Sequence, residues 1–106
     1  MTPPRWLFWH RRDLRLADNL GLAAAAAATP AVTGVVVLDP AEQAAAQQAP
    51  ARRWFLAESL HELAGRWQVA GSRLLILQGD PVLLLPRLAA ATGAAVVAWN
   101  LSLIHI

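Results

Sequence analysis

Four short apolar segments recur along the chain, at residues 6–9, 32–38, 73–78 and 94–99. They are continuous or nearly continuous apolar runs, which is typical of strands buried on both faces of a parallel sheet. Helical stretches separate them: an Ala-rich run over residues 20–28, a long segment from residue 51, and a third that follows Asp80-Pro81. This β-α-β-α-β-α-β order predicts an α/β fold with a right-handed, doubly wound parallel sheet.

The long helix has the clearest period. Its apolar positions recur at i, i+4, i+7 and i+11 and form one stripe: Leu56, Leu60, Leu63 and Trp67. On the opposite, solvent-facing side, Glu62 and Arg66 are four residues apart and are expected to pair. Gly71 is expected to end this helix.

Capping residues set the ends of the other two helices. Asp18 or Asn19 is expected to cap the Ala-rich helix, which Thr29-Pro30 ends. Asp80 and Pro81 form an N-cap and a first-turn proline. Pro86 would delete a backbone hydrogen bond in a helix that begins at Pro81, so this helix is expected to begin near Leu83.

Composition excludes several kinds of site. The chain has 106 residues and a net charge of +2. It contains no Cys, so it can form neither a disulfide nor a thiolate metal site. A cytoplasmic location is therefore expected. His10, His61 and His105 are too scattered for a metal site, and none is expected. Residues 20–38 carry no charge, but Pro30 and Gly34 divide them, so no membrane segment is expected.

The sheet topology places the candidate site. With strand order 3-2-1-4, the crevice lies between the first and fourth strands, with residues 10–15 on its floor and Asp39 nearby. Generic phosphate-binding glycine motifs are missing, so a self-sufficient nucleotide site is not expected. Arg52 and Arg53 sit at the start of the long helix, where a bound anion would offset their repulsion by the helix dipole.

Several motifs resemble one family. LFWHRRDLRLADN at residues 7–19 resembles the opening of the photolyase and cryptochrome family. The resemblance continues through Leu38-Asp39-Pro40, Pro50-Ala51-Arg52, GSRLLILQGDP at residues 71–81, and Trp99-Asn100, and it covers nearly all of residues 5–100. It implies the N-terminal α/β domain of a bacterial photolyase that repairs cyclobutane pyrimidine dimers in DNA with light.

The resemblance also implies cofactors and partners. Such a domain binds a light-harvesting antenna, and by motif the contacts are Val37, Leu38, Asp39 and Arg52. The branch that the chain most resembles favours a deazaflavin over a folate. FAD and damaged DNA would bind a C-terminal helical domain that these residues do not contain. No catalytic residue is therefore expected here, and the chain alone is expected to be inactive in repair.

Other readings remain open. A cryptochrome photoreceptor would share this domain and would signal rather than repair. An unrelated nucleotide-binding α/β module would bind ATP or AMP. The charged cluster could be a salt-bridged loop that holds the helical domain: Arg11, Arg12, Asp13 and Arg15. The five tryptophans are interpreted as core packing: Trp6, Trp9, Trp54, Trp67 and Trp99.

The last six residues depart from the resemblance. Residues 101–106 read LSLIHI, where the family would continue into an R-D-x-E-P-Y-like loop. LSLIHI is also the translation of a transposon-end sequencing adapter. The expected organisation is therefore an incomplete domain over residues 1–100, truncated after its fourth strand, and a non-native tail over residues 101–106.

Overall fold

The expected order of elements is confirmed. The computed structural model describes residues 3–11, 14, 16, 19–41, 44 and 50–100. In this part of the chain the elements are β1 (Arg5–Trp9), α1 (Leu20–Ala28), β2 (Ala31–Leu38), α3 (Pro50–Val69), β3 (Leu74–Gln78), α4 (Pro81–Thr92) and β4 (Val96–Ala98). The tail at residues 101–106 and the charged residues Arg12, Asp13 and Arg15 lie outside the described residues.

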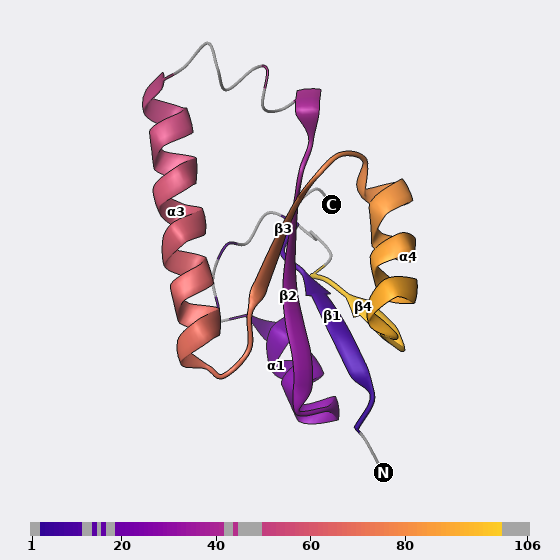
Figure 1. Cartoon of the computed structure of the whole chain (residues 1–106). Helices are drawn as coiled ribbons and strands as arrows, with labels where there is room; N and C mark the ends of the chain where they lie inside the picture. The colour runs from indigo at the N-terminus through magenta and orange to yellow at the C-terminus, as the bar shows by residue number, and fades with distance from the viewer. Residues whose placement is uncertain are drawn as a thin grey trace, which may run out of the picture.

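The four strands form one parallel sheet in the order β3-β2-β1-β4, as expected. The fold is therefore α/β. Helices α1 and α3 pack on one face of the sheet, and α4 packs on the other (Figure 1). Because β4 is reached from β3 by crossing β2 and β1, the strand order reverses between β1 and β4, which places a switch point there.

Alternate residues of the central strands face two separate cores. The core under α1 and α3 contains Phe8, Ala25, Val32, Val36, Leu60, Leu63 and Trp67. The core under α4 contains Leu7, Val35 and Leu85. Gly34 of β2 lies against the indole of Trp67, and a Cβ at this position would be 2.7 Å from the indole Cζ2. This glycine therefore lets α3 approach the sheet closely.

The helix ends follow from their capping residues. Asn19, rather than Asp18, caps α1 by accepting from Leu22 N at 3.0 Å. Gly71, at φ +86°, follows the end of α3, as expected. Asp80 is the N-cap of helix α4 and Pro81 lies in its first turn, as expected, but the helix begins at Pro81 and carries Pro86 inside it, so the expected start near Leu83 is wrong. The cap is strong enough to begin the helix, because Asp80 Oδ1 accepts from Val82 N at 2.9 Å.

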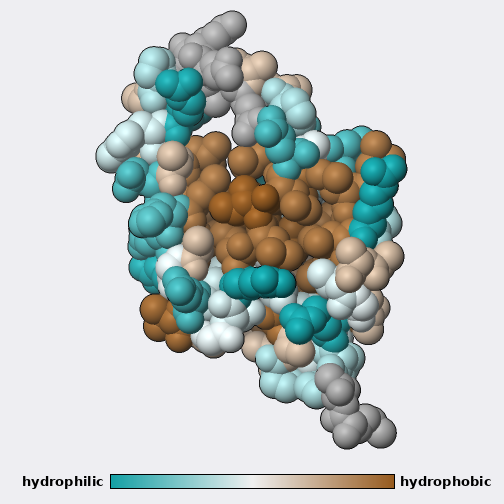
Figure 2. Space-filling view, in the orientation of Figure 1, coloured by the Kyte–Doolittle hydropathy of each residue, from teal (hydrophilic) through white to brown (hydrophobic). Residues whose placement is uncertain are grey.

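Strand β3 is apolar but incompletely covered. Figure 2 shows a broad apolar surface over the place that β3 takes between α3 and α4 in Figure 1. Ile76 of this edge strand is 45% exposed. A run of this composition is typical of a strand covered on both faces. The surface over β3 is therefore one that a soluble protein would ordinarily cover.

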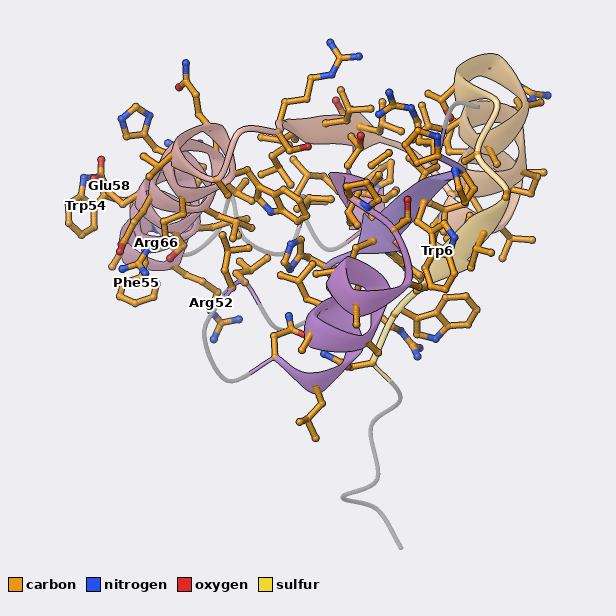
Figure 3. All side chains as sticks on the ribbon, turned by 90° about the horizontal axis from the view of Figure 1, so that it is seen from below. Trp6, Arg52, Trp54, Phe55, Glu58 and Arg66 are labelled. Atoms are coloured by element: carbon orange, nitrogen blue, oxygen red, sulfur yellow. The ribbon has the colours of Figure 1, made fainter. Side chains whose placement is uncertain are left out.

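The tryptophans divide between core and surface. Trp67 is buried, whereas Trp54 is 65% exposed on α3 and Trp99 is 41% exposed. Core packing is therefore a wrong interpretation for Trp54. Its position is off the apolar stripe of α3, so the sheet does not reach it, and Figure 3 shows it pointing away from the sheet beside Glu58.

Candidate functional site

The end of β2 positions three of the four expected site residues. Val37 and Leu38 are half-buried, and they point to opposite faces: Leu38 packs on the core under α1 and α3, and Val37 on the core under α4. Asp39 follows directly and accepts a hydrogen bond from Ala41 N at 2.8 Å, so its side chain caps the next turn. Leu38 is thus the side chain of the three that faces the α1 and α3 layer.

The backbone of Val37 points toward the crevice. His10 N donates to Val35 O at 2.8 Å, whereas Gly79 N donates to Leu38 O at 2.9 Å. The backbone N–H and C=O groups of successive residues in a strand point alternately to its two neighbouring strands. Those of Val35 and Val37 therefore point toward β1, and those of Leu38 point toward β3. Because β1 ends at Trp9, the Val37 N–H and C=O face the space beyond that strand. A ligand there could hydrogen-bond to them.

Arg52 lies in the first turn of α3, and its side chain is exposed. Figure 3 shows it extending from α3 toward the side where α1 lies, unlike Trp54. No acidic residue occupies this first turn, and Arg66–Glu62 at 2.8 Å is the ion pair found within the described part of the chain. Arg52 therefore presents a guanidinium on the same layer as Leu38, where an anionic or hydrogen-bonding ligand would be favoured.

His10 is not on the floor of the crevice, contrary to expectation. It is 1% exposed, and its Nε2 accepts a hydrogen bond from Trp67 Nε1 at 3.0 Å. Its ring also makes edge contacts with Phe8 and Trp67. His10 therefore joins β1 to α3 within the core. Sequence reasoning could not find this contact, because 57 residues separate the two partners.

Two aromatic rings meet where β1 and β4 end. Trp9 and Trp99 pack edge to face, with their centroids 5.7 Å apart. The guanidinium carbon of Arg11 lies 5.8 Å from the centre of the Trp9 ring. A cation at this distance from an indole is favourable. Arg11 is thus held on the α4 side of the sheet, away from Arg52.

An asparagine after β4 is the residue that sequence reasoning missed most clearly. Asn100 Oδ1 accepts from Gly21 N at 2.7 Å, and Asn100 Nδ2 donates to Asn19 Oδ1 at 2.7 Å. The signal was its position, two residues beyond β4 at the switch point. These hydrogen bonds therefore join the end of β4 to the start of α1. We call the three residues Asn19, Gly21 and Asn100 the asparagine clasp.

Other kinds of site find no support in the described residues. Across residues 3–11, 14, 16, 19–41, 44 and 50–100, no group of three His, Cys, Asp or Glu side chains is arranged to hold a metal ion. Within the same residues, no helix is both long and apolar enough to cross a membrane.

Known proteins are similar to this chain in sequence. The sequence model of the DNA photolyase family matches residues 6–104. A deoxyribodipyrimidine photo-lyase of Synechococcus is 55% identical over 94 residues, which are 89% of this chain and 19% of that protein. A cryptochrome DASH of Synechocystis is 34% identical over 104 residues, 93% of this chain and 21% of that protein.

One solved structure matches most of the chain. The crystal structure of a bacterial class III photolyase from Agrobacterium tumefaciens has a TM-score of 0.81 and 33% identity. The match covers 96% of this chain and 20% of the other. The chain thus spans about a fifth of the length of the relatives it matches, and their shared part is the α/β fold described above.

Proposed function

Because the chain belongs to the DNA photolyase family, we propose that it is the domain that binds the antenna chromophore of a light-driven DNA repair enzyme. The family implies FAD and an antenna. No described residue is assigned to FAD or to DNA. The antenna is the cofactor for which this domain offers contacts, and it would absorb light and pass the energy to FAD bound elsewhere in a longer protein.

The observation that supports the proposal is the exposed Arg52 side chain in the first turn of α3, on the same face of the sheet as the Leu38 side chain at the end of β2. Leu38 supplies an apolar side chain on the same layer, and the Val37 backbone supplies a donor and an acceptor directed beyond β1. A deazaflavin has a flat ring system with an ionisable hydroxyl at one end and carbonyl groups at the other. Its rings would pack on Leu38, and its polar groups would meet the Val37 backbone and the Arg52 guanidinium. The chemistry of these residues is therefore compatible with this chromophore.

The remainder of the proposed activity belongs to a longer protein. There, FAD held by the helical domain would supply the light-driven electron transfer that splits a cyclobutane pyrimidine dimer taken out of the DNA stack. We expect the chain by itself to leave dimers intact. A deoxyribodipyrimidine photo-lyase at 55% identity supports repair as the parent activity, and a cryptochrome photoreceptor that shares this domain remains the alternative.

The proposal is tested by titrating the purified chain with 8-hydroxy-5-deazariboflavin and following the chromophore's fluorescence. The wild-type chain is expected to bind. Arg52→Ala removes a charge-assisted hydrogen bond, so the Kd is expected to rise about 10-fold to 100-fold. Arg53→Ala is the matched control, because it deletes the same charge from the same exposed turn, and it is expected to change Kd by less than about 3-fold.

Equal affinities of the Arg52→Ala and wild-type chains would remove Arg52 from the site. Tighter binding of 5,10-methenyltetrahydrofolate than of the deazaflavin would overturn the deazaflavin assignment and retain an antenna. Failure of the wild-type chain to bind either chromophore would contradict the proposal as a whole.

A further inference from the structure

Strand β3 lies at an edge of the sheet, and among the strands that the structure describes only β2 pairs with it. Gly34 N of β2 donates to Arg73 O at 3.0 Å. At the other end of the strand, Gly79 N donates to Leu38 O of β2 at 2.9 Å. Backbone polar groups alternate in direction along a strand, so those of Ile76 point away from β2. An added strand could hydrogen-bond to them there.

The helix layer leaves this edge uncovered. Val36 and Ile76 are partners in the register of β2 and β3, so their side chains lie on the same face of the sheet. Val36 is nevertheless 4% exposed and Ile76 45% exposed. Helix α3 covers β2 closely, because Gly34 lets Trp67 lie against that strand. An added strand would therefore meet no covering helix at Ile76, and Figure 2 shows the apolar surface that it would cover.

Opposite charges flank β3. Arg73 precedes the strand, Asp80 follows it, and both are exposed. Neither takes part in an ion pair within the described residues. A strand with a cation before it and an anion after it is complementary to a second copy of itself in antiparallel orientation. Pairing about Ile76 sets position 73 opposite position 79, so each Arg73 comes beside Asp80 of the other copy.

We propose that β3 is an interaction surface for a second copy of this chain, in which the two β3 strands pair antiparallel about a twofold axis at Ile76. Each Ile76 then exchanges both backbone hydrogen bonds with Ile76 of the other copy, and the two exposed side chains cover each other. The two sheets become one continuous sheet. This contact needs no antenna and goes beyond the proposed function.

The first test is the oligomeric state of the chain, measured by sedimentation equilibrium over a range of concentrations. A contact through one strand edge is small, so we expect monomer at about 1 µM and dimer at about 100 µM. Ile76→Lys sets two ammonium groups opposite each other and is expected to weaken the dimer at least about 10-fold. Leu20→Lys is the matched control, because Leu20 is 85% exposed on α1, and it is expected to change the Kd by less than about 3-fold.

The second test measures the register by cross-linking. The chain has no Cys, so single cysteines can be placed along β3. In Ile76→Cys the two Cα atoms would lie about 5.5 Å apart, within the range of a disulfide. In Gln78→Cys, another exposed position of this strand, they would be more than about 10 Å apart. With copper phenanthroline as the oxidant, we expect Ile76→Cys to form a disulfide-linked dimer and Gln78→Cys to stay largely monomeric.

The third test addresses the flanking charges. Arg73→Glu sets carboxylates side by side at both ends of the paired strands, so we expect the dimer to weaken about 3-fold to 10-fold. The difference from the wild-type chain is expected to shrink as salt is added, because the charges are exposed.

A chain that stays monomeric at about 100 µM would overturn the proposal and leave β3 to be covered by a segment of a longer protein. Assemblies that grow beyond a dimer would also overturn it, because they indicate non-specific association of the apolar surface. So would equal cross-linking at positions 76 and 78, or a wild-type Kd in Arg73→Glu. Should Ile76→Lys not fold, the cross-linking pair and Arg73→Glu decide by the same outcomes.

Discussion

Asn100 and Asn19 face each other across the switch point, with Asn100 Nδ2 donating to Asn19 Oδ1 at 2.7 Å. The two residues are 81 positions apart, so this contact exists only in the folded chain. Through Gly21 it ties the last described strand to the first helix. The asparagine clasp is therefore both a long-range tertiary contact and the N-terminal cap of α1.

The two asparagines are expected to respond differently to the same substitution. Asn100→Asp replaces the Nδ2 donor by an oxygen that opposes Asn19 Oδ1, and we expect a loss of about 1–3 kcal/mol in the free energy of unfolding. Asn19→Asp keeps the acceptor oxygen and adds negative charge at a helix N-terminus, so its cost is expected to be less than half as large. Urea denaturation of both variants at pH 7 measures the difference; equal losses would contradict the assigned amide orientation.

Trp67 is expected to be needed as a hydrogen-bond donor as well as an apolar side chain. Trp67→Phe removes the donor to buried His10 Nε2, and we expect it to cost about 2–5 kcal/mol, because the smaller ring also leaves a cavity. Trp54→Phe removes the same atoms from an exposed side chain, and it is expected to change the free energy of unfolding by no more than about 0.5 kcal/mol.

A double-mutant cycle separates the hydrogen bond from the packing. In a cycle of Trp67→Phe with His10→Phe, a coupling of about 1 kcal/mol between the two sites is expected. Additive effects would show that the hydrogen bond contributes nothing to stability.

Gly34 and Gly65 offer a matched pair of glycine substitutions. Gly34→Ala would place its Cβ 2.7 Å from both Cζ2 and Nε1 of Trp67, so the indole must shift, and a loss of about 1–3 kcal/mol is expected. Gly65 lies exposed in α3 with nothing within 4 Å of its would-be Cβ, and Gly65→Ala is expected to stabilise the chain by up to about 1 kcal/mol. Thermal unfolding of the two variants is the measurement, and a neutral Gly34→Ala would show that Trp67 is loosely packed.

The uncovered surface over β3 is expected to limit solubility. Ile76→Lys puts a charge on an exposed edge strand, so we expect higher solubility of the purified chain with little change in its unfolding midpoint. Light scattering as a function of protein concentration measures the solubility, and thermal unfolding measures the midpoint. Unchanged light scattering would contradict the expected effect of this surface on solubility.

The strands and their order could be predicted because each depends on short-range pattern and on the handedness of crossovers. Continuous apolar runs marked the strands, and the crossover rule with the usual order placed β1 between β2 and β4. The predicted start of α4 was wrong because the N-cap at Asp80 favours a helix from Pro81, whereas Pro86 disfavours a helix that passes through it. The sequence pattern alone does not show which of these two effects is larger.

The side-chain contacts of the site could not be predicted in the same way. His10 was expected in the crevice because it follows β1, but its direction depends on Trp67, which another helix supplies. Asn100 was read as part of a motif, and its role depends on the absence of a Cβ at Gly21. The assignment of Val37, Leu38, Asp39 and Arg52 to an antenna remains a prediction.

The central claim is that an antenna binds beside the end of β2. Its most direct test is ¹H–¹⁵N NMR of the chain titrated with 8-hydroxy-5-deazariboflavin. The account predicts saturable shifts of the Val37, Leu38 and Asp39 amides and of the Arg52 side-chain Nε–H, with the Val82 amide of α4 unchanged. Shifts confined to other parts of the chain, or no saturable shift at all, would contradict it.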